Sequence, residues 1–280
     1  MITGRTQLFG VMGHPVAHSL SPAMQNAAFA AAGLDAAYVA LPVPPERLFE
    51  AIRGAHAMGF QGLNVTVPHK PRAAEICLSL DPVAAVTGAV NTLRRAPGGY
   101  EGFNTDAPAT LALLEAAGVR SGMRAVLLGA GGAARAGAWA LVRAGAEVSV
   151  AARRLDAAEA LCRLLVEALP GARLRPVPLP QAGAEAARAQ VVVNATSVGL
   201  PGHGGEALPA MRLGPGQVAV DFVYGDTPFA RDAVAGGALL VTGEQILVRQ
   251  GALAFSLWTG RPAPEGAMTA ALRAASGARR

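Results

Sequence analysis

A short apolar strand runs directly into a glycine-rich turn and then into a helix near the middle of this chain. Residues 125–128 are apolar, residues 129–132 read Gly-Ala-Gly-Gly, and an alanine-rich helix is expected over residues 133–144. Glycines at such a turn allow a tight reversal and let backbone N–H groups approach a pyrophosphate at the positive end of the helix. The segment therefore predicts a Rossmann-type unit that binds a dinucleotide.

Short apolar segments alternate with alanine-rich segments along the chain, which is the pattern of an α/β protein with mainly parallel sheets. Strands are expected at residues 8–12, 38–43, 63–67, 90–95, 99–103, 125–128, 147–151, 191–195, 218–222 and 239–241. Helices are expected at residues 22–32, 45–58, 72–80, 107–117, 133–144, 156–168 and 245–258, the last of which we expect to pack deeply. Pro97 and Gly98 predict a hairpin turn between two of these strands.

Composition excludes several classes of protein. With 280 residues, 52% hydrophobic and 15% charged, the chain is long enough for two domains and too apolar to be disordered. No apolar run is long enough for a membrane span, and the N-terminus lacks the pattern of an export signal. Cys77 and Cys162 have neither metal nor redox spacing, so we expect a cytoplasmic protein without a metal site.

The charge distribution does not indicate a nucleic-acid partner. The formal net charge is +5, but the arginines are scattered along the sequence and no nucleic-acid-binding module is recognisable. We therefore expect the partners to be small molecules, with no nucleic acid and no membrane. We also expect the chain to act as a monomer or homodimer.

Lys70 is the single lysine among 24 lysine and arginine residues. An ammonium can lose its proton when it is desolvated, whereas a guanidinium stays charged, so the exception favours a residue that transfers or shares a proton. The alternative is chance in a composition that favours arginine.

The residues before Lys70 alternate between polar and apolar side chains, which is typical of a β-strand. Asn64 and Thr66 would project from one face of that strand, and Pro68 would end it. Lys70 would then lie in the loop at the carboxyl end of the strand, where open α/β sheets bind their ligands. An amide, a hydroxyl and an amine on one side could hold a polyol, although an edge strand with a solvated face would give the same pattern.

The end of the second strand of the Rossmann-type unit indicates the cofactor. An NAD-specific unit usually carries Asp or Glu there, whereas this chain has Arg153 and Arg154. Arginine suits the 2′-phosphate of NADP, so NADP is the predicted cofactor. The alternative is a solvated loop with two exposed cations.

Two further polar clusters precede predicted helices. Ser21 is expected to be an N-cap with Pro22 as the first helical residue, and capping does not account for Ser19. The two hydroxyls beside a helix N-terminus could hold a carboxylate. Asp106 is either an N-cap or the carboxylate that orients Lys70.

Several segments match a known pattern in a fixed order that covers nearly the whole chain. They are residues 19–22 (Ser-Leu-Ser-Pro), 64–70 (Asn-Val-Thr-Val-Pro-His-Lys), 88–92 (Gly-Ala-Val-Asn-Thr), 104–106 (Asn-Thr-Asp), 129–134, 194–199 (Asn-Ala-Thr-Ser-Val-Gly) and Gln250. Together they resemble the shikimate dehydrogenase family, which reduces 3-dehydroshikimate reversibly to shikimate in aromatic amino-acid biosynthesis. Any one segment could arise by chance, but the ordered set is specific.

The resemblance implies a role for each matched residue. The implied catalytic pair is Lys70 and Asp106. The implied substrate-binding residues are Ser19 and Ser21 for the carboxylate, Asn64, Thr66, Asn91 and Gln250 for ring hydroxyls, and Tyr224. The implied cofactor-binding residues are Gly129, Ala130, Gly131, Gly132, Ala133, Arg153, Asn194, Thr196, Ser197 and Gly243.

The resemblance also implies two domains with the active site in the cleft between them. The expected α/β substrate domain is residues 1–105 completed by residues 243–280, and the expected NADP-binding Rossmann domain is residues 106–242. The C-terminal helices would fold back onto the substrate domain.

The chain departs from the family pattern in three places. The usual Asn-Arg-Thr after the second Rossmann strand is replaced by residues 152–154 (Ala-Arg-Arg), and a further family arginine is replaced by Ala157. Ala109 replaces a glycine, and the segment from Tyr224 to the following Thr-Pro is short. Two alternatives therefore stay open, an NAD-dependent quinate/shikimate dehydrogenase and a catalytically silent ligand sensor.

Overall fold

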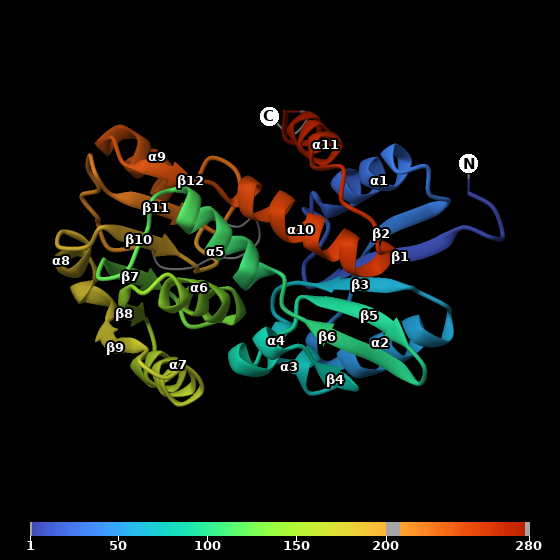
Figure 1. The fold of residues 1–280 in the computed structure, drawn as a ribbon, viewed down its shortest axis with the longest axis horizontal. Helices are drawn as coiled ribbons and strands as arrows, with labels where there is room; N and C mark the ends of the chain where they lie inside the picture. The colour runs from blue at the N-terminus through green and yellow to red at the C-terminus, as the bar shows by residue number, and fades with distance from the viewer. Residues whose placement is uncertain (1, 200–207, 278–280) are drawn as a thin grey trace. The chain divides into compact units, whose positions relative to one another are not determined.

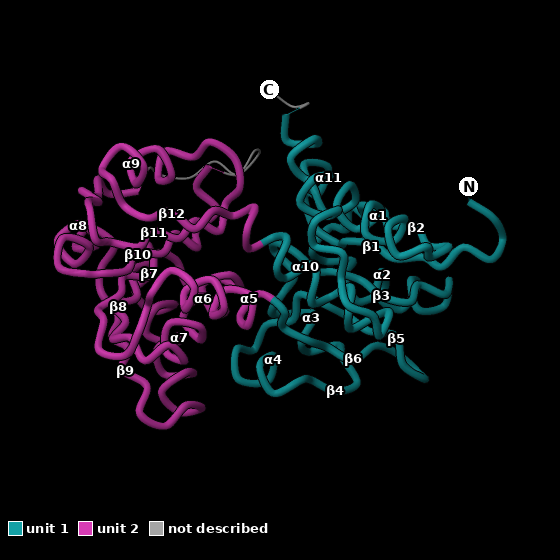
Figure 2. The backbone as a smooth tube through the Cα atoms, turned by 45° about the horizontal axis from the view of Figure 1, so that its top comes forward, with its two compact units in different colours: residues 1–105, 247–280 teal, residues 106–246 magenta. Residues whose placement is uncertain are grey.

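The computed structural model describes residues 2–199 and 208–277. The chain divides into two compact units, one formed by residues 1–105 together with residues 247–280, and the other by residues 106–246 (Figure 2). Each unit contains one six-stranded sheet with helices packed against it (Figure 1). The predicted α/β class is confirmed.

The sheet of the first unit is mixed, with the strand order β2-β1-β3-β5-β6-β4. The strands are β1 (Gln7–Gly13), β2 (Ala36–Pro42), β3 (Gly62–Val65), β4 (Ser79–Leu80), β5 (Thr92–Ala96) and β6 (Gly99–Phe103). Strand β1 is parallel to both β2 and β3, whereas β5 is antiparallel to β3 and to β6. The pair β5–β6 is the predicted hairpin.

Helices from both ends of the chain cover this sheet. They are α1 (Ser21–Ala31), α2 (Leu48–Ala57), α3 (Lys70–Ala74), α4 (Pro82–Thr87), α11 (Glu265–Gly277) and most of α10 (Gly243–Thr259). Helix α1 packs against α11, and α2 contributes the buried Leu48 and Ile52 to a core that also contains Leu63 and Val65 of β3. The C-terminal helices are therefore part of the first unit.

The sheet of the second unit is entirely parallel. Its strands are β7 (Arg124–Leu128), β8 (Glu147–Ala152), β9 (Arg173–Pro178), β10 (Val191–Asn194), β11 (Val218–Asp221) and β12 (Leu239–Val241). They are arranged in the order β12-β11-β10-β7-β8-β9 (Figure 1). Counted from β7, this is the strand order 3-2-1-4-5-6 of the Rossmann fold, with the switch point between β7 and β10. The predicted Rossmann-type fold is confirmed.

The helices of the second unit are α5 (Asp106–Ala116), α6 (Gly132–Arg143), α7 (Leu155–Ala168), α8 (Ala182–Ala186) and α9 (Pro228–Gly236). Helix α6 contacts β7 and β8, α7 contacts β8 and β9, and α8 contacts β7. No described helix is both long enough and apolar enough to cross a membrane.

Four local predictions around the proposed substrate segments are wrong. Strand β3 ends at Val65 rather than at residue 67. The open alternative of an edge strand is also excluded, because β1 and β5 flank β3. Lys70 begins helix α3 instead of lying in a loop. The predicted helix at residues 72–80 ends at Ala74, and Ser79–Leu80 forms β4. Ser21 is the first residue of α1, and Leu20 is its N-cap.

Candidate functional site

A network of buried side-chain amides and hydroxyls lies in the first unit. Asn91 is at its centre, because its Nδ2 donates to Thr105 Oγ1 at 2.9 Å and to Gln250 Oε1 at 3.3 Å. Its Oδ1 accepts from the backbone N of Thr105 at 2.7 Å. The network joins the residue before β5 and the segment after β6 to helix α10, which is far from both in sequence.

Asn64 extends this network toward helix α1. Its Nδ2 donates to the carbonyl of Asn91 at 3.1 Å and to Thr92 Oγ1 at 3.0 Å, while its Oδ1 accepts from the Tyr38 hydroxyl at 2.7 Å. Tyr38 is fully buried and also has a side-chain hydrogen bond with Ser21. Burial raises the pKa of Tyr38 well above its usual value, so the phenol stays protonated.

We call this set the amide network. It consists of Asn64, Asn91 and Gln250 together with the hydroxyls of Tyr38, Thr92 and Thr105. The three hydroxyl residues were not among the site residues predicted from the sequence. Thr92 and Thr105 lay inside matched segments and could have been found there, whereas nothing in the sequence near Tyr38 connects it to Asn64.

The two serines are close to each other at the start of α1. Ser19 Oγ accepts from the backbone N of Ser21 at 3.2 Å, a local turn at the start of the helix rather than a capping bond, because α1 has no side-chain cap. Ser21 is 6% exposed and connects to Tyr38. Thr66 is half-buried, its backbone N donates to the carbonyl of Met12, and its methyl group occupies the space that a side chain on Gly13 would fill.

Lys70 is half-buried and is held by its backbone next to the amide network. Its carbonyl accepts from the backbone N of Val90, the residue before Asn91, at 2.9 Å. The neighbouring His69 is buried, and its Nε2 donates to the carbonyl of Val43 at 2.8 Å. Burial lowers the pKa of His69, so the imidazole is neutral and acts as an anchor for this segment.

Asp106 directly follows Thr105 of the amide network. It is 6% exposed and begins helix α5, where its carbonyl accepts from Thr110 Oγ1 at 2.8 Å. Asp106 belongs to the second unit and Lys70 to the first.

The glycine turn of the second unit has the backbone geometry that the sequence predicted. Gly129 follows β7 with a φ of +107°, which disfavours an L side chain, and a Cβ there would lie 2.9 Å from the carbonyl oxygen of Ala195. Gly131 is the N-cap of α6 and makes no side-chain capping bond. The first N–H groups of α6, over residues 132–133, therefore have no side-chain cap and can serve a phosphate.

The other predicted cofactor residues lie at the same edge of this sheet. Arg153 is exposed directly after β8, and Asn194 ends β10, so both lie beside the end of β7. Arg154 is also exposed, at the N-cap position of α7. The carboxyl ends of β8, β7 and β10 thus bring together the glycine turn, an arginine and a polar loop, as a dinucleotide site requires.

Asn194 organises the loop that follows β10. Its Oδ1 accepts from the backbone N of Thr196 at 3.2 Å and from Thr196 Oγ1 at 2.8 Å. Its Nδ2 donates to Asp221 Oδ1 at 2.9 Å. Ser197 follows in the same loop and is half-buried.

Asp221 is a buried carboxylate that was not among the residues predicted from the sequence. It accepts from Thr227 Oγ1 at 2.5 Å and from the backbone N of Val223 at 3.0 Å, in addition to Asn194. Burial raises its pKa to about 6, and these hydrogen bonds offset part of the rise. The available signal was a carboxylate at the end of an otherwise apolar strand, in the same position as Asn194.

Tyr224 and Gly243 are close to each other in the second unit. Tyr224 lies between β11 and α9, and Gly243 begins α10. A Cβ on Gly243 would lie 2.7 Å from the backbone N of Tyr224, so only glycine fits against this loop. No group of three or more His, Cys, Asp or Glu side chains within the described ranges could hold a metal ion.

Comparisons with known proteins agree with this architecture. The family profile described as "Shikimate dehydrogenase substrate binding domain" matches residues 11–93, and the profile described as "Shikimate 5'-dehydrogenase C-terminal domain" matches residues 243–273. A curated relative from Anaeromyxobacter sp. (strain K), named shikimate dehydrogenase (NADP(+)), is 67% identical over 279 residues, with 100% of both chains covered.

Solved structures resemble the chain over almost its whole length. Shikimate 5-dehydrogenase from Thermus thermophilus, in complex with NADP(H) and shikimate, is 40% identical with a TM-score of 0.80 and covers 96% of this chain and 100% of its own. Quinate dehydrogenase from Corynebacterium glutamicum, in complex with NAD, is 29% identical with a TM-score of 0.85 and covers 96% and 99%. Because full-length relatives match at this level of identity, the chain belongs to the shikimate dehydrogenase family.

Proposed function

We propose that this protein catalyses the reversible, NADP-dependent reduction of 3-dehydroshikimate to shikimate. The observation that carries the proposal is the amide network of the first unit, since its buried amides and hydroxyls suit a small polyhydroxylated ring. The 67% identical relative named shikimate dehydrogenase (NADP(+)) supports the same activity.

Substrate binding is the role we assign to the first unit. Asn64, Asn91 and Gln250 offer amides whose donors and acceptors can serve ring hydroxyls, and Thr66 adds a hydroxyl. We assign the substrate carboxylate to the hydroxyls of Ser19 and Ser21, because both lie at the start of α1 where the helix dipole favours an anion. Tyr224 is a further substrate-binding candidate, contributed by the second unit.

NADP binding is the role we assign to the second unit. Gly129, Ala130 and residues 131–133 would surround the pyrophosphate at the N-terminus of α6, and Arg153 would bind the 2′-phosphate. Asn194, Thr196, Ser197 and Gly243 would line the rest of the site. The positive φ of Gly129 and the absence of a side-chain cap on α6 support this fit.

Lys70 and Asp106 are the proposed catalytic pair. NADPH, when bound, supplies the hydride that reduces the ketone carbon. Lys70 gives a proton to the ketone oxygen as it becomes a hydroxyl, and takes that proton back in the reverse direction. The Asp106 carboxylate orients the amine. The role of Lys70 is supported by its half-buried position beside Asn91 and by its being the only lysine of the chain.

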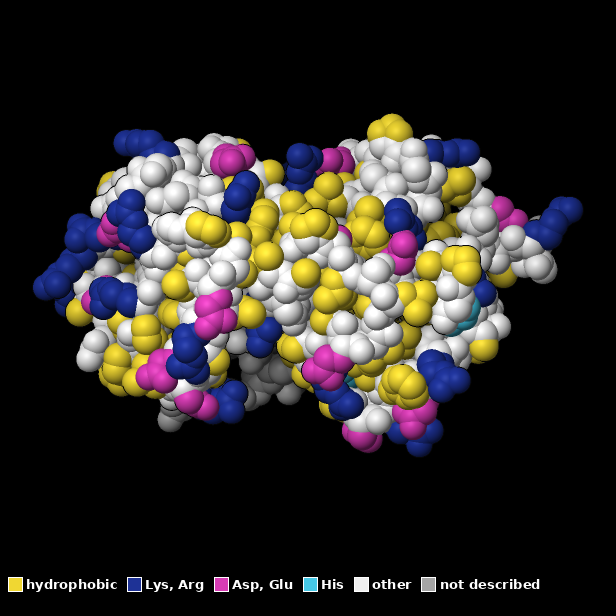
Figure 3. Space-filling model, turned by 60° about the horizontal axis from the view of Figure 1, so that its bottom comes forward, with side chains coloured by type: hydrophobic (Ala, Val, Ile, Leu, Met, Phe, Trp, Pro, Cys, Tyr) yellow, Lys and Arg dark blue, Asp and Glu magenta, His cyan; other side chains and the backbone are white. Residues whose placement is uncertain are grey.

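We further propose that the protein works in the cytoplasm as a monomer or homodimer, without a nucleic-acid partner. Both cysteines, Cys77 and Cys162, are free thiols, which suits a reducing compartment. Lysine and arginine side chains are interspersed with aspartate and glutamate on the face drawn in Figure 3, rather than gathered into one basic surface.

An absorbance assay of nicotinamide reduction tests the activity. Shikimate and quinate are each offered with NADP+ and with NAD+, and kcat/KM is compared across the four combinations. We expect shikimate with NADP+ to be the best pair. A preference for NAD+ with quinate would assign the chain to the quinate/shikimate branch, and tight shikimate binding without turnover would make it a ligand sensor; either result overturns the proposal.

A further inference from the structure

One face of the parallel sheet in the second unit is charged at the amino ends of its strands. Residues two apart on a strand point to the same face, and the register of β7, β8 and β9 aligns these residues in rows. The first row is Arg124, Glu147 and Arg173, and the second row is Val126, Ser149 and Arg175. The third row, toward the carboxyl ends, is Leu128, Ala151 and Val177.

The helix on this face covers only part of it. Helix α8 (Ala182–Ala186) packs with the apolar third row and with Val126 in one buried cluster. Sheet faces of doubly wound folds are normally buried under helices, and their residues are correspondingly apolar. Here the short α8 leaves a recess over the first two rows, with a volume of about 330 Å³.

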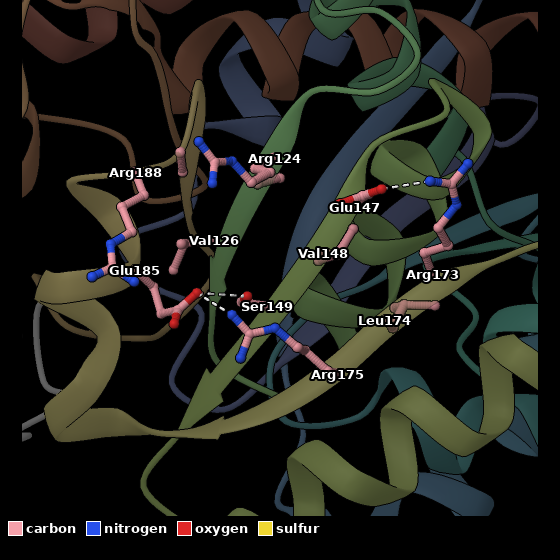
Figure 4. Close-up of a pocket in the computed structure, with 12 residues that line it drawn as sticks. Arg124, Val126, Glu147, Val148, Ser149, Arg173, Leu174, Arg175, Glu185 and Arg188 are labelled. Atoms are coloured by element: carbon pink, nitrogen blue, oxygen red, sulfur yellow. Dashed lines mark hydrogen bonds and ion pairs between the residues drawn. The ribbon is translucent and has the colours of Figure 1, made fainter.

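Arginines outnumber acidic groups in this recess. Figure 4 shows Arg124, Arg173, Arg175 and Arg188 around it, with Glu147 and Glu185 as the acidic side chains. These arginines are all exposed, whereas Val126, Val148 and Ser149 of the sheet beneath them are buried.

Both glutamates are already engaged. Glu147 pairs with Arg173 at 2.5 Å, and Glu185 pairs with Arg175 and accepts from the buried Ser149 at 3.0 Å. The hydrogen bond from Arg175 lowers the pKa of Glu185, so that carboxylate is ionised at neutral pH.

Two positive charges are left over. Arg124 and Arg188 form no ion pair with any acidic side chain in the part of the chain that the structure describes, although the charge of Arg188 also acts on Glu185. Each guanidinium offers a planar set of donors that matches a carboxylate or phosphate group. The buried Val126 and Ala189 add an apolar floor between them.

We propose that this recess binds a small anion that carries at least two carboxylate or phosphate groups. Arg124 and Arg188 bind the anionic groups, and the pairs Arg173–Glu147 and Arg175–Glu185 form the wall. The volume lies at the lower end of the range for small-molecule sites, which fits a metabolite rather than a macromolecule.

The recess is separate from the proposed cofactor site on the same sheet. Arg124 is the first residue of β7, whereas Gly129 follows its last residue, so the two sites are separated by five residues of strand, roughly 16 Å at the usual rise per residue. The anion should therefore bind to protein that is already saturated with NADP.

Isothermal titration calorimetry on the full chain, saturated with NADP at low ionic strength, tests the proposal. Citrate is the polycarboxylate probe and pyrophosphate is the phosphate probe. We expect at least one of them to bind saturably at one site per chain, and the tighter of the two identifies the chemical class. Arg124→Gln and Arg188→Gln should each weaken that binding about tenfold, because each removes one charge-assisted contact.

Arg163→Gln is the matched control, because this substitution removes the same charge at a site outside the recess. Arg163 lies on α7, and its side chain is 65% exposed. The substitution should change the affinity less than about twofold if the attraction is local. Equal loss in the control, no saturable binding of either probe, or binding only to NADP-free protein would each overturn the proposal. Shikimate turnover without added anion should be unchanged in all three variants, so this result is independent of the proposed activity.

Discussion

The Tyr38 hydroxyl connects two parts of the proposed substrate site, since it bonds to Asn64 and to Ser21. Tyr38→Phe leaves Asn64 Oδ1 without this donor, so the amide is less well oriented toward a ring hydroxyl. We expect KM for shikimate to rise roughly tenfold with a smaller change in kcat, which is the signature of a lost binding contact.

Tyr100→Phe provides the control for this prediction. Tyr100 is also buried, and its hydroxyl donates to the carbonyl of Phe60 at 2.9 Å, outside the amide network. We expect the two variants to lose similar unfolding free energy, about 1–2 kcal/mol. An equal rise of KM in Tyr100→Phe would show that the effect of Tyr38 is a general loss of stability.

Arg153 and Arg154 are adjacent exposed arginines, of which only Arg153 is assigned to the 2′-phosphate. Arg153→Gln should raise KM for NADP+ roughly tenfold to a hundredfold while leaving KM for NAD+ nearly unchanged, because NAD+ lacks that phosphate. Arg154→Gln should change neither constant appreciably. Steady-state kinetics with both cofactors would contradict the assignment if the two variants behaved alike.

Asp221 makes the stability of the protein depend on pH. Its pKa is raised by burial to about 6, so the folded chain binds this proton more tightly than the unfolded chain does. Its contribution to the free energy of unfolding is therefore greatest below the unfolded pKa and is lost as pH rises through about 6.

Asp221→Asn removes this titration. As pH falls from about 7.5 to 5, we expect the free energy of unfolding of the wild-type protein to rise by about 1–2 kcal/mol relative to that of the variant. Urea unfolding at several pH values measures the difference. The exposed Asp226, mutated to Asn, is the control and should show no such trend. A wild-type-to-variant difference that stays constant with pH would contradict the account of Asp221.

At the scale of the elements, helix α10 lies close to the sheet of the first unit at a glycine. Trp258 of α10 donates from Nε1 to the carbonyl of Leu93 at 3.0 Å, and a Cβ on Gly62 of β3 would overlap the indole ring. Gly62→Ala must therefore displace the ring or the strand, and we expect a loss of about 1–3 kcal/mol in unfolding free energy.

Gly54→Ala is the matched substitution within a helix. Gly54 lies inside α2 and a Cβ there would meet nothing within 4 Å. We expect this variant to gain about 0.5–1 kcal/mol, because alanine has less conformational entropy to lose than glycine. Urea unfolding measures the change in unfolding free energy for each substitution. Changes of opposite sign support the close packing of Trp258, and changes of the same sign contradict it.

The elements that the sequence predicted well are those with strong local signals. The hairpin at Pro97 and Gly98 and the βαβ unit around the glycine turn were both found from a few adjacent residues. Helix α4 was not predicted, although the sequence carries a signal for it. Asp81 caps the helix by accepting two backbone hydrogen bonds, and Pro82 is its first residue.

Other elements depend on partners that are distant in sequence. Strand β4 (Ser79–Leu80) exists because it pairs with β6, whereas the sequence predicted that the helix beginning at residue 72 would run through it. Strand β9 contains Pro176 and Pro178, which a strand tolerates only at the edge of a sheet, and its position there follows from the topology. The amide network could not be predicted as a whole because its members come from separate segments.

At the scale of the whole molecule, the proposed reaction needs residues from both units. Substrate would be held by the first unit and cofactor by the second, and the proposed catalytic pair takes Lys70 from one and Asp106 from the other. The proton role of Lys70 is the central claim, because an arginine in its place would keep the charge but could not release a proton.

The most direct measurement is the turnover of Lys70→Arg with shikimate and NADP+, alongside its shikimate affinity by calorimetry. We expect kcat to fall by about 10²–10⁴-fold, as in the loss of a general acid–base group, while the dissociation constant of shikimate changes by less than about threefold. Lys70→Ala should lose kcat to a similar extent. Turnover of Lys70→Arg within about tenfold of the wild-type protein would contradict the proton-transfer role.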